Sequence, residues 1–250
     1  MRKTVLALAI LGVLAAAAST ATAGETGATH WGYTGHGAPE QWGSLDPKFA
    51  ACSQGMNQSP VNIAGTVEAE LPPLMFHYRG GASEVVNNGH TIQVNVPPGN
   101  ALMVDGSAFE LKQFHFHTPS ENLIEGRSFP LEGHLVHANP QGQLAVVAIM
   151  YEAGAENKAL AQVWAAMPTK GGEKAMLAQP VNVADLLPAQ RDYYRFTGSL
   201  TTPPCSEGVR WLVMKEAVSI SAEQVGHFSH VMHHHNNRPV QPLNARLVMK

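Results

Sequence analysis

The segment Gln113-Phe114-His115-Phe116-His117 alternates polar and aromatic residues without a break. Successive side chains of a β-strand point to opposite faces of a sheet. The alternation therefore predicts a strand with two phenylalanines on one face and Gln113, His115 and His117 on the other. A chain that carries this strand has to build a sheet with one apolar face and one face that bears imidazoles.

A second strand is predicted at residues 131–137, in which Glu132 and His134 share one face. If the two strands pair, His134 lies beside His115 and His117, and three imidazoles converge on one point. Three histidines with an open fourth position are the ligand set of a catalytic zinc site. The alternative is that these are core histidines whose ring nitrogens bond to backbone groups.

Histidine ligands have a chemical consequence for such a zinc site. Three neutral imidazoles leave the full 2+ charge on the ion, whereas thiolates would cancel it, so the charge acts on a water molecule at the fourth position. Each ligand ring also needs a partner for its second nitrogen, and Gln113 and Glu132 are suited to that role. His137 is three residues from His134, so in a strand it points to the opposite face. We therefore expect it to be structural.

Short strands separated by turns are expected over much of the chain. Charged residues make up only 14% of the sequence, against roughly 25% in an average soluble domain. The 23 glycines and 17 prolines favour strands and ordered loops over a helix bundle. Further strand candidates are residues 75–78, 84–87, 91–96, 109–117 and 144–151, and helical patterns cover residues 156–167 and 221–235. Ser221 is the expected N-cap of the second helix.

No linker divides these elements, so the sequence predicts one mainly β (α+β) domain. It also predicts a processed N-terminus: residues 1–23 have a basic start, an apolar stretch and a small-x-small cleavage site, the features of a signal peptide. The alternative is a membrane anchor, although the apolar stretch is shorter than the ~20 residues that a span needs. Residues 24–250 are then the mature domain, periplasmic or secreted, with no membrane insertion after cleavage.

Export bears on the two cysteines of the chain, Cys52 and Cys205. In an oxidising compartment two cysteines are expected to pair, and the alternative is two separate thiols. A bridge across so long a loop contributes on the order of 4–5 kcal/mol in the chain-entropy model.

Several motifs in order along the chain carry a family resemblance. They are His30-Trp31-Gly32-Tyr33, residues 57–63 (NQSPVNI), Asn88-Gly89-His90, residues 113–117, residues 132–137, residues 198–204 (GSLTTPP), Asn237-Arg238-Pro239 and Gln241-Pro242-Leu243. Together they resemble the α-class carbonic anhydrases over nearly all of the mature chain. The resemblance implies a large, twisted, mostly antiparallel central sheet with short peripheral helices and a conical cleft.

The resemblance also assigns catalytic roles. It implies one Zn²⁺ per chain, bound by His115, His117 and His134. Thr201 would accept the hydrogen of the zinc hydroxide, and Glu121 would accept from Thr201, which orients the hydroxide toward the carbon that it attacks. The sequence differs from the family at residues 120–122, which are Ser-Glu-Asn where the family often has Ser-Glu-His.

The implied activity is the reversible hydration of CO2 to bicarbonate and a proton by zinc-hydroxide attack, with His90 as the histidine proton shuttle. An imidazole suits that task because it takes up and releases a proton near neutral pH. The partners are then the small molecules CO2 and bicarbonate. Nucleic acid is excluded as a partner because the net charge is −3 and no long basic run is present. The oligomeric state stays open, a homodimer included.

The resemblance places a substrate pocket and a polar wall in the cleft. The pocket residues are Val136, Val146, Leu200, Thr202, Val209 and Trp211, and the wall residues are Tyr33, Asn88 and Gln93, with Thr202 shared between the two. CO2 has no net dipole and needs a dry apolar patch, whereas the wall would hold ordered water. Simple alternation puts Gln93 opposite to His90 unless the strand bulges. The family pattern also suggests a cis bond at Pro203-Pro204.

Five histidines crowd residues 227–235. Helical spacing puts His227, His230 and His234 near one face, which is either a solvated helix surface or a second metal site. Two other functions therefore compete with the enzyme. One is a catalytically silent binding module of the same fold, and the other is a periplasmic zinc-binding protein that uses these late histidines.

Overall fold

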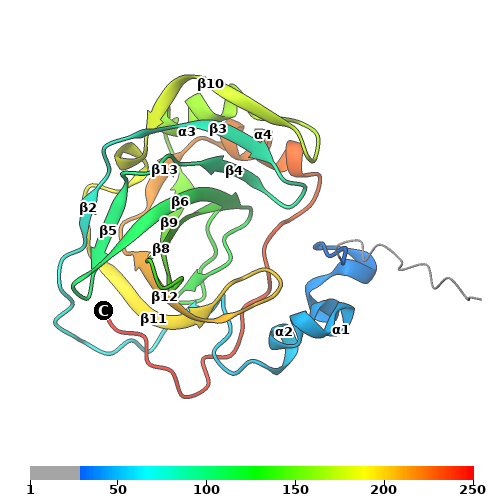
Figure 1. Ribbon diagram of the computed structural model, residues 1–250, viewed down its shortest axis with the longest axis vertical. Coiled ribbons are helices and arrows are strands. Elements are labelled where there is room, and N and C mark those ends of the chain that lie inside the picture. Colours follow the sequence, from blue (N-terminus) through cyan, green and yellow to red (C-terminus); the bar gives the residue numbers. More distant parts are fainter. Residues whose placement is uncertain (1–28) are drawn as a thin grey trace, which may run out of the picture.

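The computed structural model describes residues 29–250, so the expected signal peptide at residues 1–23 and its cleavage point lie outside the described residues. Within residues 29–250 an eleven-stranded sheet crosses the whole molecule, from β10 at one edge to β11 at the other (Figure 1). A separate two-stranded parallel sheet joins β1 (Asn62–Ile63) to β7 (Leu123–Ile124).

The main path of the large sheet runs through eight strands. In spatial order they are β10 (Lys174–Asn182), β3 (Gly81–Asn87), β4 (Ile92–Asn95), β6 (Ser107–His117), β8 (Leu131–Ala138), β9 (Leu144–Ala153), β12 (Glu207–Met214) and β11 (Tyr193–Ser199). Off this path lie β2 (Met75–His77), β5 (Ala101–Val104) and β13 (Val218–Ile220). Pairing is antiparallel except where β9 meets β12 and β13. The expected fold class, a mostly antiparallel sheet in a single α+β domain, is confirmed.

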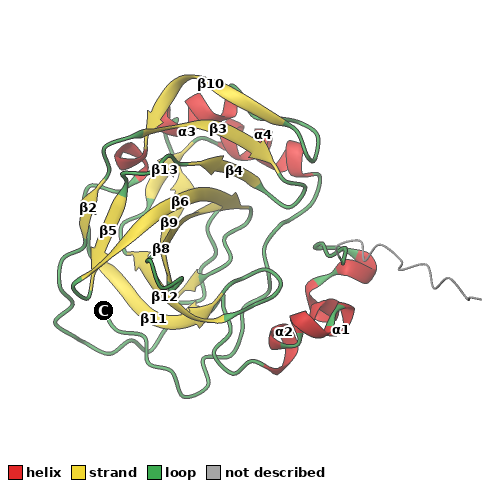
Figure 2. Cartoon of the chain, in the orientation of Figure 1, coloured by secondary structure: helices red, strands yellow, loops and turns green. Residues whose placement is uncertain are grey.

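Helices are short and lie at the periphery, as Figure 2 shows. They are α1 (Trp42–Leu45), α2 (Ala51–Gln54), α3 (Lys158–Trp164) and α4 (Ala222–Met232), with 3₁₀ turns at Gly35–Gly37, Pro39–Gln41, Pro47–Phe49 and Val183–Leu186. None of the helices in residues 29–250 has the length and apolar character needed to cross a bilayer.

Helix α4 begins where the sequence predicted. The Ser221 hydroxyl accepts from the Gln224 N–H, and the Gln224 side chain accepts from the Ser221 N–H, which is a reciprocal capping box. Its end differs from the prediction: the helix stops at Met232 because His233 adopts a left-handed conformation with φ 62°. The first predicted helix is also shorter than expected, since α3 spans Lys158–Trp164 after an Asn157 cap.

The alternation in β6 separates the two faces of the sheet as predicted. Phe114 and Phe116 are buried in the larger hydrophobic core, which α3 and α4 cover. The Phe116 ring meets Trp164 of α3 edge-to-face at 5.0 Å. The opposite face of β6 carries the imidazoles, and the core on one side thereby holds the strand that presents them on the other.

Candidate metal centre and catalytic cleft

The register between β6 and β8 brings three histidines together. His115 lies directly opposite His134, and His117 lies opposite Glu132, in the antiparallel pair. One ligand atom from each of His115, His117 and His134 lies within 4.8 Å of the others. His117 and His134 are buried and His115 is half-buried, so the cluster is closed to bulk water on most sides.

Each of the three rings uses one nitrogen to hold its orientation. His115 Nδ1 donates to Gln113 Oε1 at 2.8 Å, and His134 Nε2 donates to Glu132 Oε1 at 2.8 Å. His117 Nδ1 donates to the backbone carbonyl of Asn236 at 2.7 Å. Sequence reasoning found the first two partners but missed Asn236, which is 119 residues away from its ring.

The second nitrogens are left with their lone pairs. His117 Nε2 is buried and has no hydrogen-bond partner in the described part of the chain. A buried nitrogen without a partner is costly, and a metal ion removes that cost by taking the lone pair. Three neutral imidazoles whose other nitrogens are held by an amide, a carbonyl and a carboxylate suit zinc. The residues present therefore fit this ion.

Burial sets the protonation of the cluster. It lowers the pKa of His115 and His134 well below the ordinary value. Charge on the neighbouring imidazoles lowers both pKa values further. Burial also lowers the pKa of His117, against the raising effect of the Asn236 carbonyl. The rings are thus in the neutral form that binds metal. Burial raises the pKa of Glu132 to about 7, while its hydrogen bonds from Asn122 oppose that shift.

Glu121 and Thr201 meet beside the cluster, as the resemblance implied. Glu121 is 1% exposed, its Oε1 accepts from the Arg238 N–H at 2.9 Å, and its Oε2 lies 3.6 Å from His117 Nε2. Burial raises the pKa of Glu121 well above normal, while the Arg238 N–H and the Thr201 side chain lower it. Its Oε2 has no partner of hydrogen-bonding geometry among the described residues.

The predicted polar residues line one cleft with the histidines. This cleft has a volume of about 130 Å³, and its walls include Tyr33, Asn88, His90, Gln93, Thr202, His115 and His117. Simple alternation would have turned Gln93 away from His90. It does not apply, because β4 begins at Ile92 and His90 lies outside the strand. Gln93 lies opposite His115 in the β4–β6 pair. Trp31 and Thr91 also line the cleft and were missed, although the aromatic motif at residues 30–33 was a signal for Trp31.

The predicted apolar pocket residues gather beside His134. Val146, Val209 and Trp211 are buried in one hydrophobic cluster, against which Val136 and Leu200 pack. Trp211 stands edge-on to His134 at 4.9 Å between ring centroids, and Val136 lies opposite Val146 between β8 and β9. The polar cleft and this apolar cluster thus both adjoin the three histidines.

Comparison with known proteins agrees with this geometry. The family model of the eukaryotic-type carbonic anhydrases matches residues 37–250. The chain belongs to the carbonic anhydrase family. It is 52% identical to a carbonic anhydrase from Pectobacterium carotovorum over 91% of this chain and 93% of the relative. It is 53% identical to one from Neisseria gonorrhoeae over 89% and 88%.

A solved carbonic anhydrase shows the same architecture. The α-carbonic anhydrase from Thermovibrio ammonificans, determined with the inhibitor sulfanilamide, is 50% identical and superposes with a TM-score of 0.88. The match covers 90% of this chain and all of that one. This is an enzyme family, and the predicted fold and family resemblance are both confirmed.

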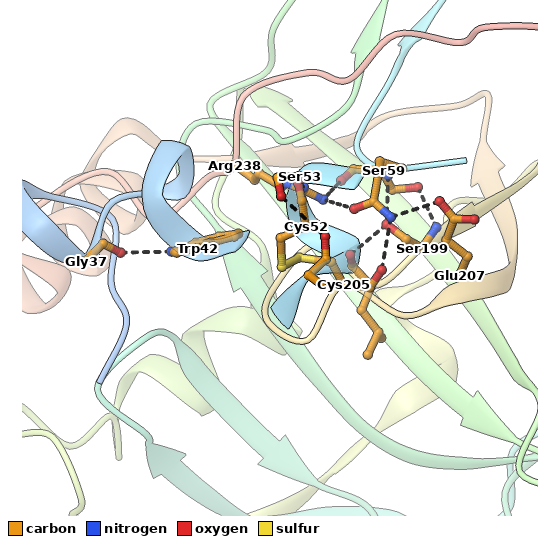
Figure 3. The surroundings of a disulfide bond; sticks show 12 residues. Gly37, Trp42, Cys52, Ser53, Ser59, Ser199, Cys205, Glu207 and Arg238 are labelled. Carbon is orange, nitrogen blue, oxygen red and sulfur yellow. Dashed lines mark hydrogen bonds between the residues drawn. A yellow bond between two sulfur atoms is a disulfide. The ribbon is translucent and has the colours of Figure 1, made fainter. Parts of the chain in front are cut away.

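The carbonic anhydrase cleft is braced by a disulfide between Cys52 of α2 and Cys205 (Figure 3). The expected pairing is present, and the alternative of two free thiols is wrong. The Gln58 amide donates to the Cys205 carbonyl at 3.0 Å, and the buried Arg238 guanidinium donates to the Cys52 carbonyl at 2.8 Å. The bridge thus ties the N-terminal arm to the loop that carries Thr201, where the Pro203–Pro204 bond is cis as expected.

The remaining histidines of this carbonic anhydrase chain divide into two groups. His137 is buried, and its ring bonds to the Tyr78 hydroxyl at 2.7 Å and to the Ala145 carbonyl at 3.2 Å, in agreement with the structural role predicted for it. The prediction for His234 is wrong, because α4 ends before it and it does not share a helix face with His227 and His230. Within residues 29–250 the late histidines form no cluster with metal-ligand spacing.

Proposed function

We propose that the protein is a zinc-dependent enzyme that catalyses the reversible hydration of CO2 to bicarbonate and a proton. The observation that carries this proposal is the set of three neutral imidazoles, each held by its second nitrogen, beside a polar cleft and an apolar cluster. A zinc ion bound there would lower the pKa of a water molecule to about 7, the value known for carbonic anhydrases, and so supply a hydroxide nucleophile near neutral pH.

Glu121 and Thr201 would orient the nucleophile. Glu121 already accepts from the Arg238 N–H through one oxygen, and its other oxygen is free to accept the hydroxyl hydrogen of Thr201. Once that hydrogen is engaged, Thr201 can only accept a hydrogen bond from the nucleophile. The nucleophile's lone pair then points at the CO2 carbon, which is catalysis by orientation.

The apolar wall would bind the substrate. CO2 offers no net dipole and gains little from hydrogen-bond donors, so a dry surface beside the nucleophile suits it. Val136, Val146, Leu200, Val209 and Trp211 supply that surface. Thr202 lines the cleft with Tyr33, Asn88 and Gln93, where polar groups would order the water that carries the proton away.

His90 would be the proton shuttle. Its ring lies at the cleft wall and stacks on Trp31 with centroids 3.7 Å apart. Burial lowers the pKa of His90, and the neighbouring His30 and His234 lower it further. A proton that His90 takes up is therefore released easily, which suits a carrier that must return to its neutral form in every turnover.

Export is part of the same proposal. The disulfide between Cys52 and Cys205 is typical of an oxidising compartment. With residues 1–23 as signal peptide, we infer that the mature chain begins near Gly24 and works in the periplasm or outside the cell. A silent binding module is disfavoured because the chain keeps all three histidines and Thr201. A zinc-storage role is disfavoured because the late histidines do not converge.

The test measures metal content and CO2 hydration together. The purified mature protein should hold one zinc per chain and hydrate CO2 in a stopped-flow assay. A chelator should abolish hydration and added zinc should restore it. A simple aromatic sulfonamide should bind the zinc form in competition with small anions and should not bind the metal-free form. Lack of hydration by protein with one zinc per chain would refute the proposal.

A further inference from the structure

His234 lies against Tyr33, a side chain that lines the cleft, although helical spacing did not place it there. The chain that follows α4 runs along the open side of the sheet toward the N-terminal helices, and Arg238 in it bonds to α2 (Figure 1). The His234 ring is partly exposed and lies 5.9 Å from the Tyr33 ring, between centroids. Tyr33 in turn contacts Trp31 at 5.8 Å, on which His90 stacks. His90 and His234 thus each contact one ring of the Trp31–Tyr33 pair.

The segment that carries His234 is anchored to the reaction site. Asn236, two residues further on, donates its Nδ2–H to the His90 carbonyl at 3.1 Å. The Asn236 carbonyl accepts from the metal-site ring of His117 at 2.7 Å. Asn236 is fully buried, so this segment holds its place relative to both His90 and the metal centre.

The tautomer of His234 leaves a proton acceptor free. Its Nδ1 lies 2.9 Å from the backbone carbonyl of His235. A carbonyl oxygen can only accept, so Nδ1 carries the hydrogen and Nε2 carries the lone pair. A neutral imidazole in this state can take one proton at Nε2 and later release it to solvent.

His234 also lies within electrostatic range of His90. His30 and His234 are the titratable groups whose charge lowers the pKa of His90, after the effect of burial. Such an effect requires proximity, because charges farther apart than about 8 Å are screened at physiological ionic strength. A charge on the His234 ring therefore disfavours protonation of His90, which places the two rings within electrostatic reach of each other.

We propose that His234 is a second proton acceptor at the cleft mouth, which works in parallel with His90. The proton arrives through cleft water and forms a bond with His234 Nε2. That bond breaks when the proton passes to buffer, and the ring returns to its neutral tautomer. This inference rests on the proposed function, since it assumes that hydration releases a proton in the cleft.

The kinetic test compares His234→Ala, His90→Ala and the double variant in weak buffer. His234→Ala alone should lower kcat less than about twofold, because His90 carries most of the flux. In the His90→Ala background it should lower kcat further, toward about 10³ per second. That limit for direct proton loss to water is a diffusion-limited reprotonation of roughly 10¹⁰ per molar per second multiplied by an acid constant of about 10⁻⁷. In all variants kcat/KM should be unchanged, and added imidazole should restore kcat. His230→Ala, which removes a histidine from α4, is the matched control and should change nothing.

A second readout does not depend on activity. In metal-free protein, NMR titration should show a higher pKa for His90 in His234→Ala than in the unmodified chain, because a like charge has been removed. Equal kcat in His90→Ala and the double variant, with no change in the pKa of His90, would overturn the inference and leave the proposed function intact. Failure of the zinc-loaded unmodified protein to hydrate CO2 would instead refute the proposed function itself.

Discussion

The floor and the mouth of the cleft are built from different kinds of structure. The floor is made of two adjacent strands, β6 and β8, whose register sets His115 opposite His134. The mouth is made of loops: Trp31 comes from the N-terminal arm and His90 from the turn before β4. His234, from the chain after α4, lies against the cleft residue Tyr33. Strand pairing thus positions the metal ligands, and side-chain packing positions the groups at the mouth.

Burial follows the same division. His117, Glu121, Glu132 and His134 are each at most 1% exposed, whereas His90 and His234 are partly exposed. A change in the floor leaves a buried polar partner unsatisfied, which is costly. A change at the mouth costs less free energy, because solvent can take over the hydrogen bonds of a removed side chain. Substitutions should therefore have severe effects in the floor and graded, buffer-dependent effects at the mouth.

The largest effect is expected from the ligands. His117→Ala should abolish tight zinc binding and CO2 hydration, because it removes one of three metal-binding nitrogens and frees the Asn236 carbonyl. Zinc per chain by atomic emission and hydration by stopped flow measure the two losses. Replacing His115 or His134 should have the same result. Full activity with zinc retained in any of the three would contradict the ligand assignment.

Glu132→Ala provides a graded comparison within the floor. It keeps all three ligands but removes the carboxylate that holds His134, so zinc affinity or activity should fall only about 10–100-fold. A loss as complete as that of His117→Ala would mean that Glu132 has a role beyond orientation.

The disulfide should be the next most important feature, and its effect should fall on the mouth and the Thr201 loop rather than on the metal ligands. The bridge packs with Trp42 in a small cluster that includes the mouth residues Trp31 and Tyr33. Cys205→Ser should lower the free energy of unfolding by about 2–5 kcal/mol. Denaturant unfolding gives this value, and zinc content should stay at one per chain. Loss of zinc from the folded variant would show that the floor depends on the bridge as well.

His90→Ala should affect turnover alone. We expect kcat in weak buffer to fall about 100-fold, the lower end of the range that general acid–base groups contribute. The value of kcat/KM for CO2 should remain nearly intact, since attack on CO2 precedes proton export. Stopped-flow assays with and without imidazole separate the two constants. An unchanged kcat would assign the main proton path to another group.

The smallest effect concerns pH. His90 accepts a proton only when neutral, and because burial lowers its pKa, the acid limb of kcat in weak buffer should lie below the ordinary value of about 6.5. Trp31→Ala removes the ring that stacks on His90. The pKa of His90 should then rise, and the acid limb should move to higher pH by less than about one unit. A limb that moves to lower pH would contradict burial as the main cause.

Local periodicity was sufficient to predict which side chains of the two floor strands face the cleft. The alternation of residues 113–117 placed Phe114 and Phe116 in the core and His115 and His117 on the opposite face, as the structure has them. The parity of residues 132–137 separated His134 from His137 correctly. Each of these predictions depends on one strand and its neighbour, because a strand's side chains alternate whatever surrounds it.

Only the tertiary structure decided the partners that come from far along the chain. The carbonyl that holds His117 and the N–H that holds Glu121 both belong to the segment after α4, 119 and 117 residues away. His234 contacts Tyr33 from outside the helix, because His233 turns left-handed and ends α4 before it. Backbone carbonyls and N–H groups are alike at every residue, so no sequence pattern marks which of them meets a given side chain. Packing of the whole chain makes that selection.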